Sequence, residues 1–323
     1  MGALYITLSV LLGVLLLGLA VTLICFFRVF YLRRTGKPPA MPNAEIYEAH
    51  RAEMDAWVAE TRAMPHKTVY IRSHDGLRLR AKLYTYREGA PVEIMLHGYR
   101  GSAERDLSGG VARAFASGHS ALIVDQRGCG GSEGHMATFG ILERHDCERW
   151  VRFVTEELCP GCPVILTGIS MGASTVMLCA AQELPREVIG VLADCGFTSA
   201  RAIIEKVIRD MHLPSRLLYP FVRLSARLLG GFRLDEVSSI DAMRQSRLPV
   251  LLFHGDADAF VPCTMSEENA CACAAPCSLH IIEGAGHGLC YPVDKEGYVA
   301  AVRAFFLPLE AAWYEKSKEN LTS

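Results

Sequence analysis

Three short segments of the chain carry residue types that act together in acyl-transfer chemistry. Residues 168–172 read Gly-Ile-Ser-Met-Gly, residues 254–258 hold two aspartates, and residues 284–288 hold a histidine among glycines. A serine hydroxyl attacks an acyl carbon when a histidine accepts its proton, and a carboxylate orients that histidine. The chain order of serine, acid and histidine therefore predicts a nucleophilic site built from Ser170, one of the two aspartates, and His287.

The serine motif stands between two segments that would position it. An apolar run over residues 163–167 precedes the motif, and a stretch of helical composition over residues 173–184 follows it. G-x-S-x-G between a strand and a helix is typical of a sharp turn that presents the serine oxygen above a sheet, at the positive end of a helix. The motif alone has little specificity, and the strand and helix on either side supply it.

An acyl-transfer site also needs N–H donors for the oxyanion of the transition state. In this arrangement one donor is the backbone N–H of the residue after the serine, Met171, and the other comes from the loop after the third strand. That loop, residues 97–102, reads His-Gly-Tyr-Arg-Gly-Ser, and we expect the Tyr99 N–H to be the second donor. We interpret His97 as a residue that braces the loop.

The hydrophobic pattern predicts the frame that would bring these segments together. Apolar faces with helical spacing recur within residues 107–115, 147–158 and 298–306, between short apolar runs. This alternation is typical of an α/β fold, a mostly parallel sheet with helices on both faces. A turn at residues 74–76 joins two alternating segments that add an antiparallel edge. The expected strands are residues 68–72, 77–84, 92–96, 120–124, 164–168, 188–193, 250–254 and 278–282.

Residues 198–245 break the alternation of strands and helices. They are helical in composition and too long for a simple crossover, so we interpret them as a cap over the carboxyl edge of the sheet, where ligands bind. Arginines are interleaved with the leucines and aromatic residues of this segment. The simpler interpretation is a helix packed on the sheet with its arginines in solvent. The alternative is a lid that lines an apolar acyl pocket or contacts anionic lipid.

Five motifs, in order and at similar spacing, resemble the α/β-hydrolase superfamily over residues 66–312. They are HGYRGS, DQRGCGGSEG, GISMG, HGDADAFVP and GAGHG. The chain is most similar to capped, membrane-anchored hydrolases of the serine aminopeptidase and monoacylglycerol lipase type. The resemblance implies eight strands with a helical cap. It also implies that the acid is Asp258 rather than Asp256, because in such enzymes the acid is followed by two residues and then Val-Pro.

The expected activity is therefore that of a serine hydrolase. We expect it to cleave an ester, as a carboxylesterase or lipase-like enzyme, through a Ser-His-Asp triad and an acyl-enzyme. The alternatives are a serine peptidase or thioesterase on the same triad, or a non-catalytic binding member of the fold. A small-molecule or lipid ester is the expected substrate, and the proposed reaction needs no cofactor and no metal. Ser170 itself argues against dehalogenase-like chemistry, which uses aspartate at this position, and against dienelactone-hydrolase-like chemistry, which uses cysteine.

The N-terminal segment predicts a membrane anchor. Residues 4–27 are 24 uncharged, mainly apolar residues, which is long enough to span a bilayer with some tilt. A cleaved signal peptide is the rival interpretation, but it would have a basic start, a shorter apolar core and small residues at the cleavage site. The cations that follow are expected to hold the hydrolase domain in the cytoplasm. They are Arg28, Arg33, Arg34 and Lys37.

The composition agrees with this organisation and limits the classes of partner that the protein could bind. The 323 residues are 50% hydrophobic and carry a net charge of −2, so we expect a globular core and no nucleic-acid partner. The 12 cysteines favour a reducing compartment in which most are small buried apolar residues, and their spacing does not favour zinc. The expected parts are an anchor and basic flank over 1–34, a linker and leading helix over 35–65, and a hydrolase domain over 66–323.

Overall fold

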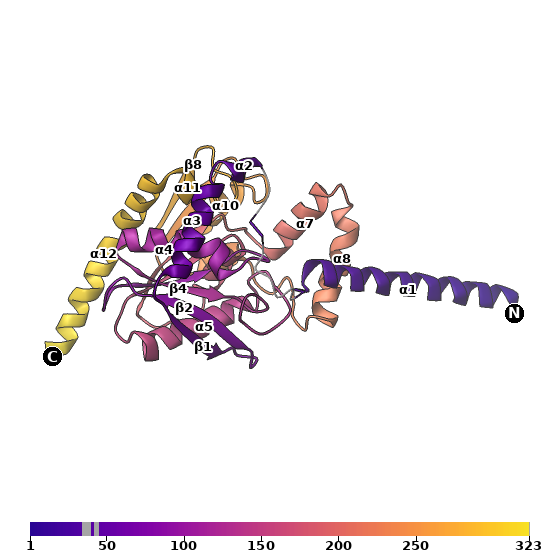
Figure 1. Ribbon diagram of the computed structural model, residues 1–323. Helices are drawn as coiled ribbons and strands as arrows, with labels where there is room; N and C mark the ends of the chain where they lie inside the picture. The colour runs from indigo at the N-terminus through magenta and orange to yellow at the C-terminus, as the bar shows by residue number, and fades with distance from the viewer. Residues whose placement is uncertain (34–39, 42–44, 323) are drawn as a thin grey trace.

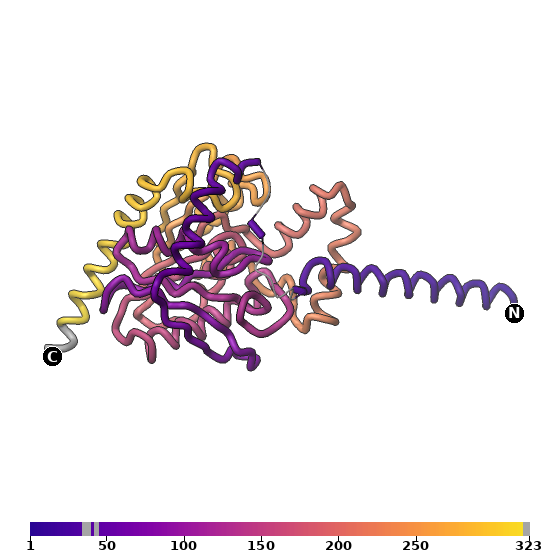
Figure 2. Tube along the Cα trace, in the orientation of Figure 1, coloured from indigo at the N-terminus to yellow at the C-terminus, as the bar shows by residue number. Residues whose placement is uncertain are grey.

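The computed structural model describes residues 1–33, 40–41 and 45–322. A central sheet forms the body, and two helices extend from it in opposite directions, one carrying the N-terminus and the other the C-terminus (Figures 1 and 2). Most of the predicted linker, together with Arg34 and Lys37 of the predicted basic flank, lies outside the described residues.

Eight strands form a single sheet in the order β1-β2-β4-β3-β5-β6-β7-β8. β1 pairs with β2 and β2 with β4 in antiparallel fashion, and every other pairing is parallel. The predicted fold class and its eight strands are thereby confirmed, each strand to within one residue at either end. The strands are β1 Lys67–Arg72, β2 Arg78–Tyr84, β3 Val92–Leu96, β4 Ser120–Asp125, β5 Val164–Ile169, β6 Val188–Asp194, β7 Val250–Gly255 and β8 Cys277–Ile282.

Helices cover both faces of the sheet, because the central strands are apolar on both sides. Strands β3, β4 and β7 are buried along their whole length, and Trp150 of α5 is completely buried against one face. The predicted leading helix is divided into two helices, α2 (Glu45–Glu48) and α3 (Arg51–Ala63). One face carries α3, α4 (Ala103–Ser117), α11 (Cys290–Val293) and α12 (Lys295–Thr322); the other carries α5 (Glu143–Phe153), the π-helical turn Val154–Leu158, α6 (Met171–Cys179) and α10 (Thr264–Ala272).

Three helices occupy the long connection between β6 and β7. Helices α7 (Ala200–Asp210) and α8 (Ser215–Leu228) project from the body as a hairpin, whereas α9 (Ser239–Gln245) packs back against α6 (Figure 1). The hairpin lies where the sequence places its cap.

Helix α1 (Gly2–Val29) is joined to the body more closely than a simple anchor would be. Its first two-thirds are exposed, but a stripe at helical spacing, from Gly18 to Phe26, packs against the cap helix α8. Beyond the helix, Phe30 is completely buried, and its ring lies 5.3 Å from that of Phe232. Leu32 donates its backbone N–H to the carbonyl of His135 at 2.8 Å. The end of the apolar segment is therefore part of the protein core, which its sequence does not reveal.

The cysteines only partly match the expectation of small buried apolar residues. Cys159 and Cys162 form a disulfide at the turn before β5, and the other ten are free. Four of the free cysteines are buried, five are half-buried, and Cys271 is exposed.

A buried ionic network joins the third strand to the C-terminal helix. Glu93 of β3 accepts hydrogen bonds from Arg113 at 2.8 Å and from His119 at 2.7 Å. The other ring nitrogen of His119 lies 2.9 Å from Glu310 of α12. Burial disfavours the charged form of His119, but its hydrogen bonds to Glu310 and Glu93 outweigh burial and raise its pKa to about 9.

The raised pKa makes a prediction about stability. A group with a raised folded-state pKa stabilises the protein most below its unfolded pKa, here 6.5, and loses that contribution as the pH passes about 9. We expect His119→Gln to lower the free energy of unfolding by about 3 kcal/mol near pH 6, and by much less near pH 10. Unfolding of both proteins in detergent across this range measures the difference; a difference that is constant with pH would contradict the assignment.

Candidate active site

Ser170 occupies a strained turn between β5 and α6. Its backbone has φ 57° and ψ −119°, a conformation that is unfavourable for a residue with a side chain. The flanking glycines make the turn possible. A Cβ on Gly172 would lie 2.0 Å from the carbonyl oxygen of Leu96, and a Cβ on Gly168 would lie 2.2 Å from the carbonyl oxygen of Gly172. The sequence G-x-S-x-G is thus required by close contact between backbones.

The structure brings three of the predicted site residues into hydrogen-bond contact. Ser170 Oγ lies 2.9 Å from His287 Nε2, and His287 Nδ1 lies 2.7 Å from Asp258 Oδ2. With Nδ1–H donated to the carboxylate, Nε2 is the nitrogen that can accept the serine proton. Ser170 follows β5, Asp258 follows β7 and His287 follows β8, so the carboxyl edge of the sheet assembles all three.

The two candidate aspartates have different surroundings. Asp258 Oδ1 accepts backbone N–H groups from Phe260 and Val261, each at 2.8 Å. Burial alone would raise the pKa of the Asp258 carboxyl, but hydrogen bonds from His254 and His287 hold it well below its usual value. Asp256 instead caps a loop by accepting the N–H of Gly284 at 2.7 Å. Asp258 is therefore the aspartate that contacts His287.

Two residues beside this trio were not among the predicted site residues. His254 is completely buried; its Nε2–H donates to the carbonyl of Val261 at 2.9 Å, and Nε2 lies 3.3 Å from Asp258 Oδ2. Tyr47 of α2 donates its hydroxyl to the carbonyl of His287 at 2.8 Å. His254 could have been suspected from its place at the end of β7. Tyr47 lies 240 positions from its partner, and no local pattern connects them.

The loop between β3 and α4 lies beside the serine, as the sequence predicts. A Cβ on Gly98 would lie 3.4 Å from Ser170 Cβ. His97 is completely buried and braces the loop: its Nδ1–H donates to the carbonyl of Gly98 at 2.8 Å, and its Nε2 accepts the N–H of Gln126 at 3.1 Å. Met171 begins α6, so its N–H is one of the first four of the helix, which have no acceptor inside it.

The side chain of Tyr99, the other predicted donor, contacts α1 and Phe139. Its hydroxyl donates to the carbonyl of Val29, the last residue of α1, at 2.6 Å. Its ring stacks on Phe139 with the centroids 5.2 Å apart. Any contribution of Tyr99 to an oxyanion hole therefore falls to its backbone N–H, while its side chain ties this loop to the end of α1.

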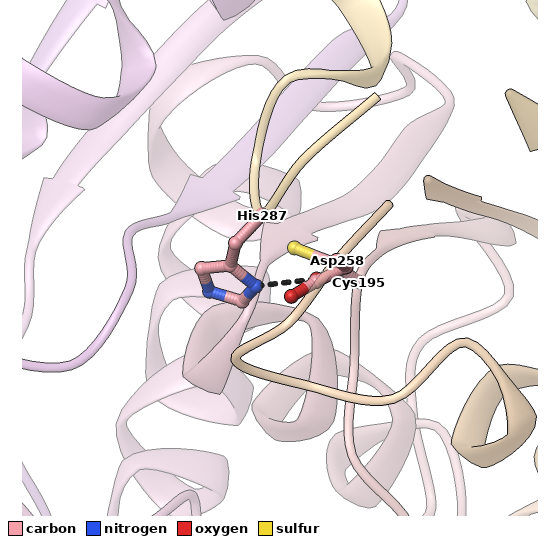
Figure 3. Close-up of side chains that lie close together, drawn as sticks. All are labelled: Cys195, Asp258 and His287. Carbon is pink, nitrogen blue, oxygen red and sulfur yellow. Dashed lines mark hydrogen bonds and ion pairs between the residues drawn. The ribbon is translucent and has the colours of Figure 1, made fainter. Parts of the chain in front are cut away.

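Cys195 lies alongside Asp258 and His287 (Figure 3), and the three could each offer a metal-ligand atom within 4.8 Å. The chemistry of these atoms fits a metal poorly. Both oxygens of Asp258 and both ring nitrogens of His287 already have hydrogen-bond partners within the protein. Burial and the neighbouring Asp194 raise the pKa of the Cys195 thiol, which disfavours the thiolate that a metal would need.

Comparison with known proteins identifies the relatives of this chain. The profile of the alpha/beta hydrolase family matches residues 94–302. The Bacillus subtilis protein YqkD is 28% identical over 189 residues, which are 58% of this chain and 62% of YqkD. A Mycobacterium tuberculosis protein is 26% identical over 243 residues, 74% of this chain and 78% of that protein. The chain thus aligns with somewhat less than two-thirds of YqkD.

Solved structures with the same fold cover more of the chain. An esterase from Pyrococcus furiosus superposes with a TM-score of 0.63 at 20% identity, over 87% of this chain and 98% of that one. Est1E from Butyrivibrio proteoclasticus, with ferulic acid bound, gives a TM-score of 0.58 at 23% identity, over 75% of this chain and 99% of that one.

The close contact at the serine turn leads to a prediction about glycine replacement. We expect Gly172→Ala to destabilise the fold by about 3 kcal/mol or more, because its Cβ would overlap the carbonyl oxygen of Leu96 and neither backbone can move freely. Gly13→Ala on α1 is the matched control, since no atom beyond the surrounding backbone of its own helix lies within 4 Å of its added Cβ. Thermal unfolding in detergent compares the two, and equal midpoints would refute the close contact.

Proposed function

We propose that this chain, which belongs to the alpha/beta hydrolase family, is a membrane-anchored serine hydrolase that cleaves a carboxylic ester. The observation that carries the proposal is the hydrogen-bonded series Ser170–His287–Asp258, with contacts of 2.9 and 2.7 Å. These residues come from three different loops, and a series in this order is the arrangement that activates a serine.

In the proposed reaction, Ser170 Oγ attacks the carbonyl carbon of the ester while His287 Nε2 takes its proton. The tetrahedral intermediate carries a negative oxygen, which the N–H groups of Met171 and Tyr99 stabilise. His287 then gives its proton to the leaving alcohol, and an acyl-enzyme remains. Water, deprotonated by His287, attacks this acyl-enzyme and releases the acid. Asp258 holds the imidazole in the tautomer that this cycle requires.

The electrostatics of Asp258 support this role. Its lowered pKa keeps the carboxylate charged when His287 becomes a cation, so the cation is stabilised as it forms. His254 contacts the same carboxylate oxygen, Asp258 Oδ2, at 3.3 Å. Burial opposes the charged form of His254, yet the contacts with Asp258 and the carbonyl of Val261 raise its pKa. We propose that His254 positions Asp258 and takes no direct part in the chemistry.

An ester with an apolar acyl group is the substrate class that the surroundings favour. Met171, directly after the serine, belongs to a cluster of apolar side chains between the sheet and the cap. The solved neighbours include esterases, one of them with ferulic acid bound. A peptidase or thioesterase would use the same triad, and these remain the alternatives. The apolar cluster includes Phe139, Phe197, Ile203, Ile204, Tyr219 and Val261.

The packing of α1 supports an uncleaved anchor over a signal peptide. Phe26 and Phe30 are buried in the same apolar cluster as Phe139 and Phe232. Cleavage after the apolar segment would remove part of this core and leave a cavity, at a typical cost of several kcal/mol for large side chains. We propose that residues 1–34 are the anchor with its basic flank, and that residues 66–323 form the hydrolase domain.

We place the hydrolase domain in the cytoplasm. Arg28 and Arg33 follow the apolar stretch directly, as the positive-inside rule requires. The ten free cysteines agree with a reducing compartment, whereas the disulfide between Cys159 and Cys162 is the feature that argues for an oxidising one.

The proposed mechanism predicts that Ser170→Ala abolishes ester hydrolysis. We expect kcat to fall by about 10⁴-fold or more on nitrophenyl esters in detergent, because the attacking oxygen is lost. A fluorophosphonate probe is expected to label the wild-type protein and not the variant. Folded protein that neither hydrolyses esters nor takes the probe would contradict the serine mechanism.

Two aspartate variants provide the matched control. Asp258→Asn is expected to reduce kcat by about 10⁴-fold, because an amide favours the wrong tautomer of His287. Asp256→Asn, two residues away, is expected to change kcat little. Equal losses in the two variants would show that the loop, rather than one carboxylate, matters.

The proposed anchor predicts that the membrane-bound protein keeps its N-terminal residues. We expect a C-terminally tagged chain to resist alkaline extraction from membranes and to have the intact mass of the untagged chain, 35.4 kDa, plus the tag. Because Cys271 is exposed, a membrane-impermeant maleimide tests the topology. A shortened, extractable product would contradict the anchor, and labelling of Cys271 in intact cells would contradict the cytoplasmic location.

A further inference from the structure

The cap helix α8 has an exposed apolar face with no described partner beyond its contact with α1. Leu217, Leu224 and Leu228 are 62%, 43% and 64% exposed. At 3.6 residues per turn, these leucines lie on the side of α8 opposite its buried residues Tyr219, Val222 and Ala226. The leucines therefore lie on the face of α8 that is turned away from its buried contacts. Helix α1 extends from the side of α8 away from the body of the protein (Figure 1).

The contact between α8 and α1 determines how deep this face of α8 would lie in a bilayer spanned by α1. A Cβ on Gly18 of α1 would lie 3.7 Å from the ring of Phe221, in the middle of α8. A hydrocarbon core about 30 Å thick takes up about 20 residues of a helix. The apolar stretch of residues 4–27 is only slightly longer, so any placement of the core within this stretch includes Gly18. The ring of Phe221 must then reach the acyl chains.

The positive charge of α8 is complementary to the surface of an anionic bilayer. The helix carries three arginines and no acidic residue. Arg216, Arg223 and Arg227 are exposed and share the side of α8 next to the leucines. Apolar side chains on one face with cations beside them are typical of a helix that lies in the membrane interface, where the cations reach the phosphates of anionic lipids.

We propose that α8 is a second membrane-binding element, which lies in the interface of an anionic bilayer with Leu217, Leu224 and Leu228 in the acyl region. This inference rests on the proposed anchor, because α1 sets the depth. It goes beyond the anchor in assigning the cap itself to the membrane. The connection between β6 and β7 is thereby held at the lipid surface, and an ester embedded in that surface is the substrate that the proposed active site meets first.

Tryptophan fluorescence in vesicles tests the proposal on the full-length chain. Leu228→Trp is compared with Leu15→Trp on α1 and with Leu307→Trp on α12, all three being exposed leucines in helices. The vesicles contain phosphatidylglycerol and a phospholipid brominated on its acyl chains, which quenches tryptophans at that depth. The signal of the three native tryptophans is subtracted by using the wild-type protein.

We expect quenching of Leu15→Trp and Leu228→Trp and none of Leu307→Trp. Quenching of Leu15→Trp alone overturns the membrane contact of α8 and leaves the anchor in place. If the protein then dimerises through the leucines, this face of α8 binds a second copy of the chain instead. Loss of quenching at both Leu15→Trp and Leu228→Trp overturns the anchor, and this inference with it.

The arginines give an independent measurement. In Leu228→Trp, we expect quenching to increase with the fraction of phosphatidylglycerol, and to lose most of this increase when Arg216, Arg223 and Arg227 are all changed to Gln. Hydrolysis of a soluble short-chain ester by the same triple variant should stay within about twofold of wild type, which shows that the protein is folded. Quenching that does not depend on the lipid charge would overturn the role of the arginines.

Discussion

The contact between Gly172 and the carbonyl of Leu96 is the constraint on which the candidate site depends. It lets the first turn of α6 approach the end of β3, and this approach places Ser170 beside the loop of residues 97–102. The neighbouring strands then determine where Asp258 and His287 lie, because parallel strands end at the same edge. A strained backbone at Ser170 persists because the surrounding strands leave it no alternative.

The same loop links the candidate site to the N-terminal helix. The hydroxyl of Tyr99 holds the last carbonyl of α1, and Arg100 donates to the carbonyl of Arg28 at 2.8 Å. Helix α1, the cap and the loop of residues 97–102 therefore meet in one apolar cluster around Phe30. Movement of any one of the three must be accommodated by the others, since close-packed interiors deform little.

The sequence predicts the parts of this protein whose signal is local. Buried strands are short apolar runs between turns, and each residue of the proposed triad follows such a run. The strands and the three hydrogen-bonded residues could therefore be located in advance. The stripe of α1 that packs on α8 could not, because a helix that is apolar all round shows no contrast between its buried and exposed faces. His254 and Tyr47 were missed for different reasons. His254 opens the HGDADAFVP motif, but its contacts with Asp258 and Val261 depend on how that loop folds back. Tyr47 lies outside the five motifs, and only the fold brings it to His287.

The fixed junction between α1 and the body has a consequence for how the protein would encounter its substrate. A flexible tether lets an enzyme sample the solution around it, whereas a helix whose end is part of the core does not. With α1 in a bilayer, Ser170 would stay within a thin layer parallel to the membrane plane. For a substrate that resides in that membrane, turnover would then follow the number of substrate molecules per unit area, and dilution of the surrounding solution would leave it unchanged.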